Sequence, residues 1–176
     1  MQNAPMRYSV LLVLCAVGLA DLAEAQRPII VRSLMGRGRV LSDTMGTPYT
    51  VPYPAEAVFH ALPAVYESLK IPPEVRDSAM QAVGNQGFDR RVEVAGRRIS
   101  GMMQCGSGAD GDYADYYKIS LSLITFVTPV DANSSTVRSV FLGSATTGTA
   151  RGTRECRSNG ELERRIQDLV KRQLDK

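Results

Sequence analysis

The stretch YYKISLSLITFVT, residues 116–128, decides the fold class of this chain. From Tyr117 to Leu123 its side chains alternate between apolar and polar, which is the period of a β-strand with one buried and one solvated face. Half-solvated strands are typical of antiparallel sheets, because parallel strands are usually covered on both faces. The stretch therefore predicts a long strand over Tyr116–Thr128 in an antiparallel sheet.

A second strand follows after a short turn. Residues 129–135, PVDANSS, consist mainly of turn-forming residues. Residues 136–150 are rich in valine, threonine and small residues, and they predict a strand that runs back along the first. Together the two strands predict a long antiparallel hairpin.

Upstream of this hairpin the pattern is less regular. Glu74–Val83 predicts a short strand and Gly84–Gly87 a turn. The Ala95-Gly96 pair predicts a hairpin between Arg91–Val94 and Arg98–Met103. We therefore expect further antiparallel strands on this side of the sheet.

Two amphipathic helices flank the strands. Residues 54–70 place apolar side chains at spacings of three and four, the period of a helix with one buried face. Pro63 removes a backbone hydrogen bond within this helix and predicts a kink or a restart. Near the C-terminus, Ser158 and Glu161 have the spacing of a capping box, and an apolar stripe follows them.

The order helix, antiparallel strands, helix predicts an α+β fold. Both amphipathic helices are expected to pack on one face of an antiparallel sheet, with the other face partly open. The expected organisation is a signal peptide over residues 1–25, an extended lead-in with one or two short strands over 26–47, and a single domain over 48–176.

The first 25 residues have the three parts of a secretory signal peptide. Arg7 supplies the positive charge, Tyr8–Ala20 the apolar segment, and Ala23-Glu24-Ala25 the cleavage site. Cys15 is a poor candidate for lipidation, because Leu14 before it is not small. We expect cleavage after Ala25, a periplasmic or extracellular location, and no transmembrane segment in the mature chain.

The charge of the chain argues against a nucleic-acid partner. The net charge is +3, and removing one arginine and two acids with residues 1–25 raises it to about +4. Nucleic-acid-binding domains carry a stronger, clustered basic charge. We therefore expect a protein or an envelope component as the partner.

Two cysteines remain after cleavage, Cys105 and Cys156. An even pair in an exported chain predicts one disulfide bond. Cys105 opens the loop CGSGADGDYADY, whose glycines match the spacing of a dinucleotide-binding turn. Such a turn must open a helix, and here the following residues predict a strand. The loop acids also resemble a calcium loop, but Leu121 stands where an EF-hand requires glutamate. We expect neither a cofactor nor a metal.

Catalytic groups are sparse. His60 is the single histidine, so histidine-rich zinc sites are excluded. The sequence has no nucleophile elbow, and Cys105 is expected to be bonded to Cys156. We therefore predict no catalytic residue and no enzymatic activity.

The acids and tyrosines of the loop form the candidate interaction surface, since exposed tyrosines are common in binding interfaces. Alternation predicts that Tyr116 lies in the strand and faces away from Tyr117. The candidate residues are Asp110, Asp112, Tyr113, Asp115 and Tyr116.

A helix after a short strand, a long antiparallel hairpin and a C-terminal helix resemble, in this order, the small periplasmic domains of BamC. BamC is a lipoprotein of the outer-membrane β-barrel assembly machinery. The resemblance is architectural and covers about residues 48–174. It implies a small periplasmic domain, and it transfers no functional residue.

Two functional hypotheses follow. The first is an exported, non-enzymatic binding or structural module of the cell envelope, which uses the open face of the sheet or the loop Asp110–Tyr117. The alternative is a carrier of a small hydrophobic ligand, with a pocket between helix 54–70 and the sheet.

Overall fold

The computed structural model describes residues 29–32, 38–41, 46–146 and 152–176. The predicted signal peptide, much of the lead-in and residues 147–150 of the predicted second strand lie outside the described residues. In chain order the elements are β1 (Ile29–Arg32), β2 (Gly38–Leu41), β3 (Tyr49–Val51), α1 (Ala55–Ser68), β4 (Val75–Asp77), β5 (Ala82–Arg91), β6 (Glu93–Val94), β7 (Arg97–Arg98), the 3-10 helix η1 (Ile99–Gly101), β8 (Met103–Gln104), β9 (Ser107–Gly108), β10 (Gly111–Asp112), α2 (Tyr113–Tyr116), β11 (Lys118–Asp131), β12 (Ser134–Thr146), β13 (Thr153–Ser158) and α3 (Glu161–Leu174).

The fold is α+β, as predicted, and is built on a seven-stranded antiparallel sheet. The strand order is β4-β5-β11-β12-β13-β8, and β3 pairs with β12 as the seventh strand. The predicted hairpin is confirmed as β11 and β12 at the centre of the sheet. Its turn is shorter than expected, because Pro129–Asp131 stay in β11. Asp131 Oδ1 accepts a hydrogen bond from Asn133 N at 2.8 Å, which closes the hairpin within two residues.

The predicted turn at Gly84–Gly87 is wrong, because these residues lie inside β5. The chain reverses instead at residues 78–81, between β4 and β5. A Cβ atom at Gly84 would lie 2.2 Å from Leu123 O, so the glycine permits close contact with β11. The β5–β11 register shifts beside this point, and Asn85 Oδ1 accepts a hydrogen bond from Gly87 N at 2.9 Å. The shift falls between Asn85 and Phe88, so Gln86 and Gly87 form a β-bulge rather than a turn.

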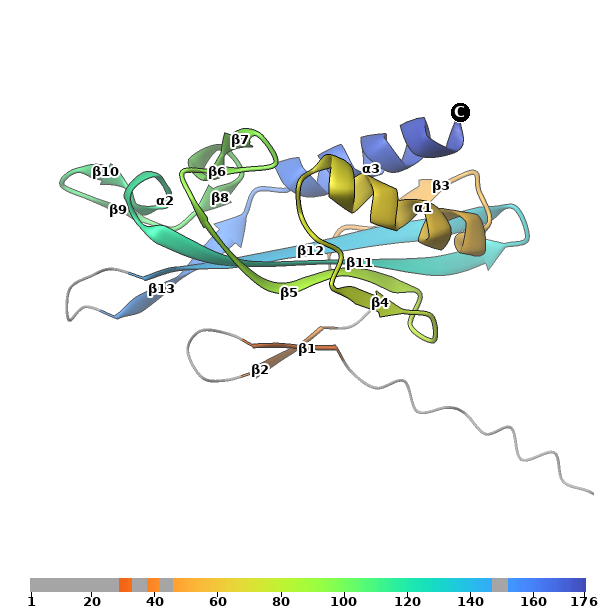
Figure 1. Cartoon of the computed structure of the whole chain (residues 1–176), viewed down its shortest axis with the longest axis horizontal. Coiled ribbons are helices and arrows are strands. Elements are labelled where there is room, and N and C mark those ends of the chain that lie inside the picture. The colour runs from red at the N-terminus through yellow and green to blue at the C-terminus, as the bar shows by residue number, and fades with distance from the viewer. Residues whose placement is uncertain (1–28, 33–37, 42–45, 147–151) are drawn as a thin grey trace, which may run out of the picture.

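Both amphipathic helices pack on the same face of the sheet, as predicted (Figure 1). Helix α1 contacts β5, β11 and β12, and α3 lies beside α1 and contacts β12. The predicted restart at Pro63 is absent, since α1 continues through it. Leu62 and Val65 beside Pro63 are 0% and 2% exposed, and this burial stabilises the helix across the missing hydrogen bond. No helix in the described ranges is long and apolar enough to cross a membrane.

The predicted capping box at Ser158 and Glu161 is wrong. Ser158 ends β13, and Gly160 is the N-cap of α3 with a φ of 85°, a conformation that glycine adopts readily. Ser158 Oγ accepts a hydrogen bond from Gly160 N at 3.1 Å, and Asn159 Oδ1 accepts one from Glu161 N at 3.0 Å. Capping is therefore shared by two side chains that precede the N-cap.

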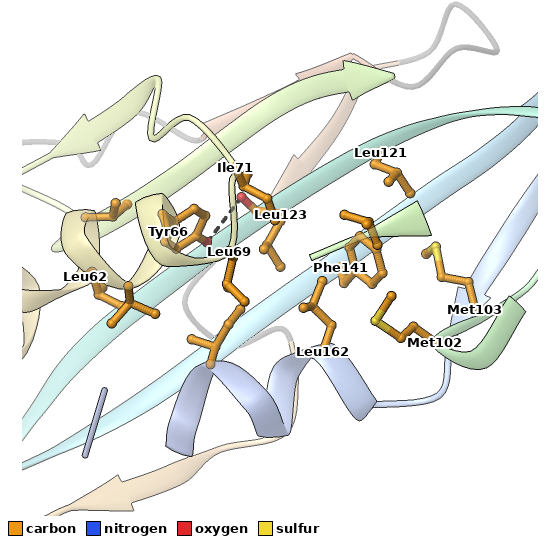
Figure 2. Close-up of a cluster of buried hydrophobic side chains, with 14 of the residues drawn as sticks. Leu62, Tyr66, Leu69, Ile71, Met102, Met103, Leu121, Leu123, Phe141 and Leu162 are labelled. Carbon is orange, nitrogen blue, oxygen red and sulfur yellow. Dashed lines mark hydrogen bonds between the residues drawn. The ribbon is translucent and has the colours of Figure 1, made fainter. Parts of the chain in front are cut away.

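The main core lies between the helices and the sheet (Figure 2). Leu62 of α1 and Leu162 of α3 are fully buried, and they pack with Leu123 of the sheet in one cluster. Tyr66 OH donates to Leu123 O at 3.3 Å and is 2.9 Å from Thr125 Oγ1, so the one polar atom of this ring is satisfied. Burial raises the pKa of Tyr66, which keeps the phenol neutral.

The opposite face of the sheet is open only at one end. Ile124 and Phe126 are 0% exposed and belong to a second, smaller cluster. Strands β1 and β2 form a separate two-stranded sheet that lies on this side of the molecule, close to β5 (Figure 1). At the other end, exposed Lys118 and Asp89 form an ion pair at 2.6 Å. This end of the face therefore carries exposed charged side chains.

Candidate binding surface

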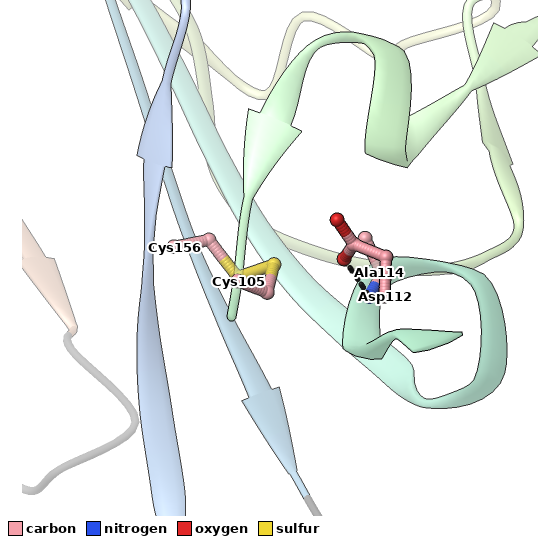
Figure 3. The surroundings of a disulfide bond; sticks show 4 residues. All are labelled: Cys105, Asp112, Ala114 and Cys156. Carbon is pink, nitrogen blue, oxygen red and sulfur yellow. Dashed lines mark hydrogen bonds between the residues drawn. A yellow bond between two sulfur atoms is a disulfide. The ribbon is translucent and has the colours of Figure 1, made fainter. Parts of the chain in front are cut away.

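A disulfide bond anchors the candidate loop. Cys105 and Cys156 are bonded to each other, as predicted (Figure 3). Met103 and Gln104 pair with β13, and the disulfide follows at the next residue. Both cysteines are buried, at 2% and 6% exposure. One end of the loop is therefore fixed to the strand that leads into α3.

The predicted strand start at Tyr116 is wrong, because Tyr113–Tyr116 form one helical turn, α2. Asp112 is its N-cap, and Asp112 Oδ1 accepts a hydrogen bond from Ala114 N at 2.8 Å (Figure 3). Aspartate at this position satisfies a free N–H at a helix start, which favours a helical turn over an earlier strand. Strand β11 begins only at Lys118.

The three loop acids have different environments. Asp112 caps α2, and Asp115 Oδ1 accepts a hydrogen bond from Ser100 Oγ at 2.7 Å, which ties α2 to η1. Asp110 is exposed, and its side chain has no partner among the described residues. In the part of the chain that the structure describes, no group of three or more His, Cys, Asp or Glu side chains is placed to hold a metal ion.

Tyr113 belongs to the framework of the loop. Its ring packs edge-to-face against Tyr117 at 5.4 Å, and the Arg154 guanidinium lies 5.5 Å from its centroid. A Cβ atom at Gly108 would lie 2.9 Å from the Tyr113 ring, so the ring closes tightly over the β9–β10 hairpin. Tyr113 therefore supports the loop and is not available as a free contact residue.

Tyr116 is the exposed aromatic residue of the predicted set. It is 59% exposed, and its ring lies over Gly111, where a Cβ atom would be 3.1 Å from it. Gly111 has a φ of 115°, which only glycine adopts without strain. Tyr116 and Asp110 are the two exposed members of the predicted surface, and we call this pair the α2 surface.

Val92 lies at the same end of the molecule, and sequence reasoning did not single it out. It is 39% exposed and connects β5 to β6. Helix α2 contacts both β5 and η1, so the α2 surface and the β6–β7 hairpin lie at one end of the sheet (Figure 1). A single valine at the end of a strand carries no sequence signal for exposure, because valine favours buried strands.

The remaining chemical groups do not converge on the loop. His60 lies on α1, with Nδ1 3.0 Å from an Arg76 guanidinium nitrogen and Nε2 3.7 Å from Glu56 Oε1. The glycine motif GSGADG forms the β9–β10 hairpin, and the helix behind it has only four residues. A dinucleotide turn needs the N-terminus of a full helix.

Fold and site together define a class: an α+β domain with a disulfide-anchored surface loop. No family model, curated protein or solved structure matches the chain. The resemblance to BamC domains stays a prediction, and the proposals below depend on the geometry of this chain alone.

Proposed function

We propose that this protein is an exported, non-enzymatic binding module of the cell envelope that recognises a protein or an envelope component through the α2 surface. The observation that carries the proposal is the 59% exposure of Tyr116 on a short helix with several fixed contacts. Both neighbours of Tyr116 in the chain are held in place. Asp115 accepts a hydrogen bond from Ser100, and the ring of Tyr117 packs against that of Tyr113. An aromatic side chain on such a support loses little conformational entropy on binding, which favours affinity.

Two further observations support the proposal. The disulfide supports export, because disulfides persist in oxidising compartments. The same bond occupies both described cysteines, so neither supplies a thiolate nucleophile. His60 contacts Arg76 and Glu56 on the surface of α1, and neither of these side chains is a hydroxyl or thiol nucleophile.

The carrier alternative has less support. The apolar side chains that α1 directs toward the sheet are each 0–4% exposed: Val58, Phe59, Leu62, Val65 and Tyr66. Their packing between α1 and the sheet forms part of the main core. No observation in the described residues favours a ligand at this place, so we do not propose a carrier.

Photo-crosslinking tests the proposal. A photoreactive amino acid replaces Tyr116 in the full chain, and a second variant carries it at Val130. Val130 is 58% exposed in β11 and thus matches Tyr116 in exposure but not in location. We expect a specific crosslinked product in the native host at position 116 only.

Excess unlabelled wild-type chain should suppress this product, and excess Tyr116→Ala chain should not. Equal products at both positions, or suppression by both competitors, would contradict the proposal. The thermal unfolding midpoint of the Tyr116→Ala chain, measured in parallel, would show whether the variant remains folded.

A further inference from the structure

Val92 has a strained backbone that burial does not explain. Its φ is +64°, in the left-handed region, where a β-branched residue is an outlier. This conformation is unfavourable for a residue with a Cβ atom, which comes too close to the following carbonyl oxygen. Val92 is also 39% exposed, so its side chain gains little from packing. Strain of this kind at an exposed residue indicates a role other than stability.

The chain path requires the conformation but not the valine. Val92 is the single residue between β5 and β6, and Val92 O accepts a hydrogen bond from Ile99 N at 2.8 Å. Glycine or asparagine would make the same turn with less strain. The exposed apolar side chain is therefore the feature that the fold does not need.

Two arginines near Val92 in the chain have no partner among the residues that the structure describes. Residues 90–98, RRVEVAGRR, contain four arginines and one glutamate. Arg90 donates to Lys70 O at 3.1 Å, and Arg97 is 3.6 Å from Glu161. In contrast, the exposed side chains of Arg91 and Arg98 make no hydrogen bond or ion pair with any described residue. Arg91 directly precedes Val92 in the chain. Arg98 directly precedes Ile99, whose N–H donates to Val92 O.

We propose that Val92, Arg91 and Arg98 form a docking surface for an acidic protein segment that carries an apolar side chain. The guanidinium groups of Arg91 and Arg98 provide donors for carboxylates, and the exposed side chain of Val92 provides an apolar contact. Two arginines contribute too little attraction for stable binding to an anionic membrane, which favours a protein partner. The inference rests on the proposed function, since it adds the chemistry of the partner at the end of the molecule that carries the α2 surface.

Selection from a random peptide library displayed on phage tests this inference without knowledge of the natural partner. The target is the full mature chain, with the disulfide intact. We expect enrichment of peptides in which an apolar residue is flanked by Asp or Glu. Binding of the enriched peptides should weaken at least tenfold in the R91E/R98E variant. Enrichment of basic peptides, no enrichment, or equal binding to this variant would overturn the inference.

Three further measurements keep the outcomes distinct. The Val92→Gly variant should unfold at a higher temperature and bind the enriched peptides more weakly, whereas Val130→Gly should leave peptide binding unchanged. Unchanged peptide binding by Val92→Gly would remove Val92 from the surface. Binding of the chain to anionic vesicles that is lost in R91E/R98E would replace the protein partner by a lipid surface. Peptides that depend on Tyr116 but not on the arginines would leave the proposed function standing and refute this inference.

Discussion

Gly84 and Gly87 lie three residues apart in β5 but differ in their surroundings. A Cβ atom at Gly84 would meet Leu123 O at 2.2 Å, whereas one at Gly87 would have no neighbour within 4 Å. We expect Gly84→Ala to destabilise the protein by about 1–3 kcal/mol, because the strands must separate to admit the methyl group. Gly87→Ala is the matched control and should change the free energy of unfolding by less than about 0.5 kcal/mol. Urea denaturation measures both, and equal effects would contradict the close contact.

Glu163 is a partly buried carboxylate in the first turn of α3. Burial raises the pKa of Glu163, although a hydrogen bond from Ser158 partly offsets it, and Glu163 Oε2 has no hydrogen-bond partner. Because the pKa of Glu163 is raised in the folded state, Glu163 contributes fully to the free energy of unfolding below its ordinary pKa of 4.5. This contribution is lost as the pH rises through the pKa of the folded state. Glu163→Gln should therefore stabilise the protein at pH 7 but not at pH 4.

Glu161 in the same turn provides the control of opposite sign. Its pKa is lowered, mainly by the hydrogen bond from Arg164, so its contribution is present above the ordinary pKa and is lost as pH falls. Glu161→Gln should therefore not stabilise the protein at pH 7. Unfolding midpoints in urea at pH 4 and pH 7 measure both variants. A gain in stability at pH 7 for both would refute the role of burial at Glu163.

At the scale of the element, α1 ends in a Schellman motif. Ile71 N donates to Tyr66 O at 3.0 Å and Lys70 N to Glu67 O at 2.9 Å, with Lys70 at a φ of 57°. Because a lysine in this conformation is strained, Lys70→Gly should stabilise the protein by about 1 kcal/mol. Glu67→Gly, within the helix, should destabilise it by up to about 1 kcal/mol. Thermal unfolding tests the pair, and a lower midpoint for Lys70→Gly would contradict the motif.

The disulfide connects two elements, the candidate loop and the strand before α3. It closes a loop with a sequence separation of 51, which corresponds to about 4 kcal/mol in the chain-entropy model. The Cys105→Ala/Cys156→Ala variant should lose stability of this order in guanidinium chloride. Wild-type protein with a reducing agent serves as the control, and its free energy of unfolding should fall by a similar amount. Alkylation of both cysteines in unreduced, unfolded protein would show that the bond is absent.

At the scale of the whole molecule, β11 and β12 should be the most stable part of the fold. They pair with each other over their full length, with β5 on one side, and with β3 and β13 on the other. Amides at Ile119–Val127 should therefore exchange with deuterium more slowly than amides of α3, which contacts the sheet along one face. Mass spectrometry of peptic fragments measures this order. Slower exchange in α3 would place the stability centre in the helical layer.

The sequence by itself determined the features that depend on local periodicity. Alternation from Tyr117 to Leu123 predicted the central strand, and helical spacing predicted α1 and α3 on one face. The disulfide was predicted from the two cysteines, Cys105 and Cys156, that remain if the predicted signal peptide is removed. These patterns are reliable because burial of one face acts on every second residue of a strand and on every third or fourth residue of a helix.

Only the tertiary structure decided how glycines, caps and loop acids are used. Gly84, which was predicted to lie in a turn, contacts another strand, and Gly160 rather than the predicted Ser158 is the N-cap of α3. The candidate surface was reduced from five residues to Asp110 and Tyr116, since the other three side chains bond or pack within the molecule. The structure also shows that Val92 is exposed at the same end of the sheet as these two residues. Such roles depend on contacts between residues distant in sequence, which no local pattern encodes.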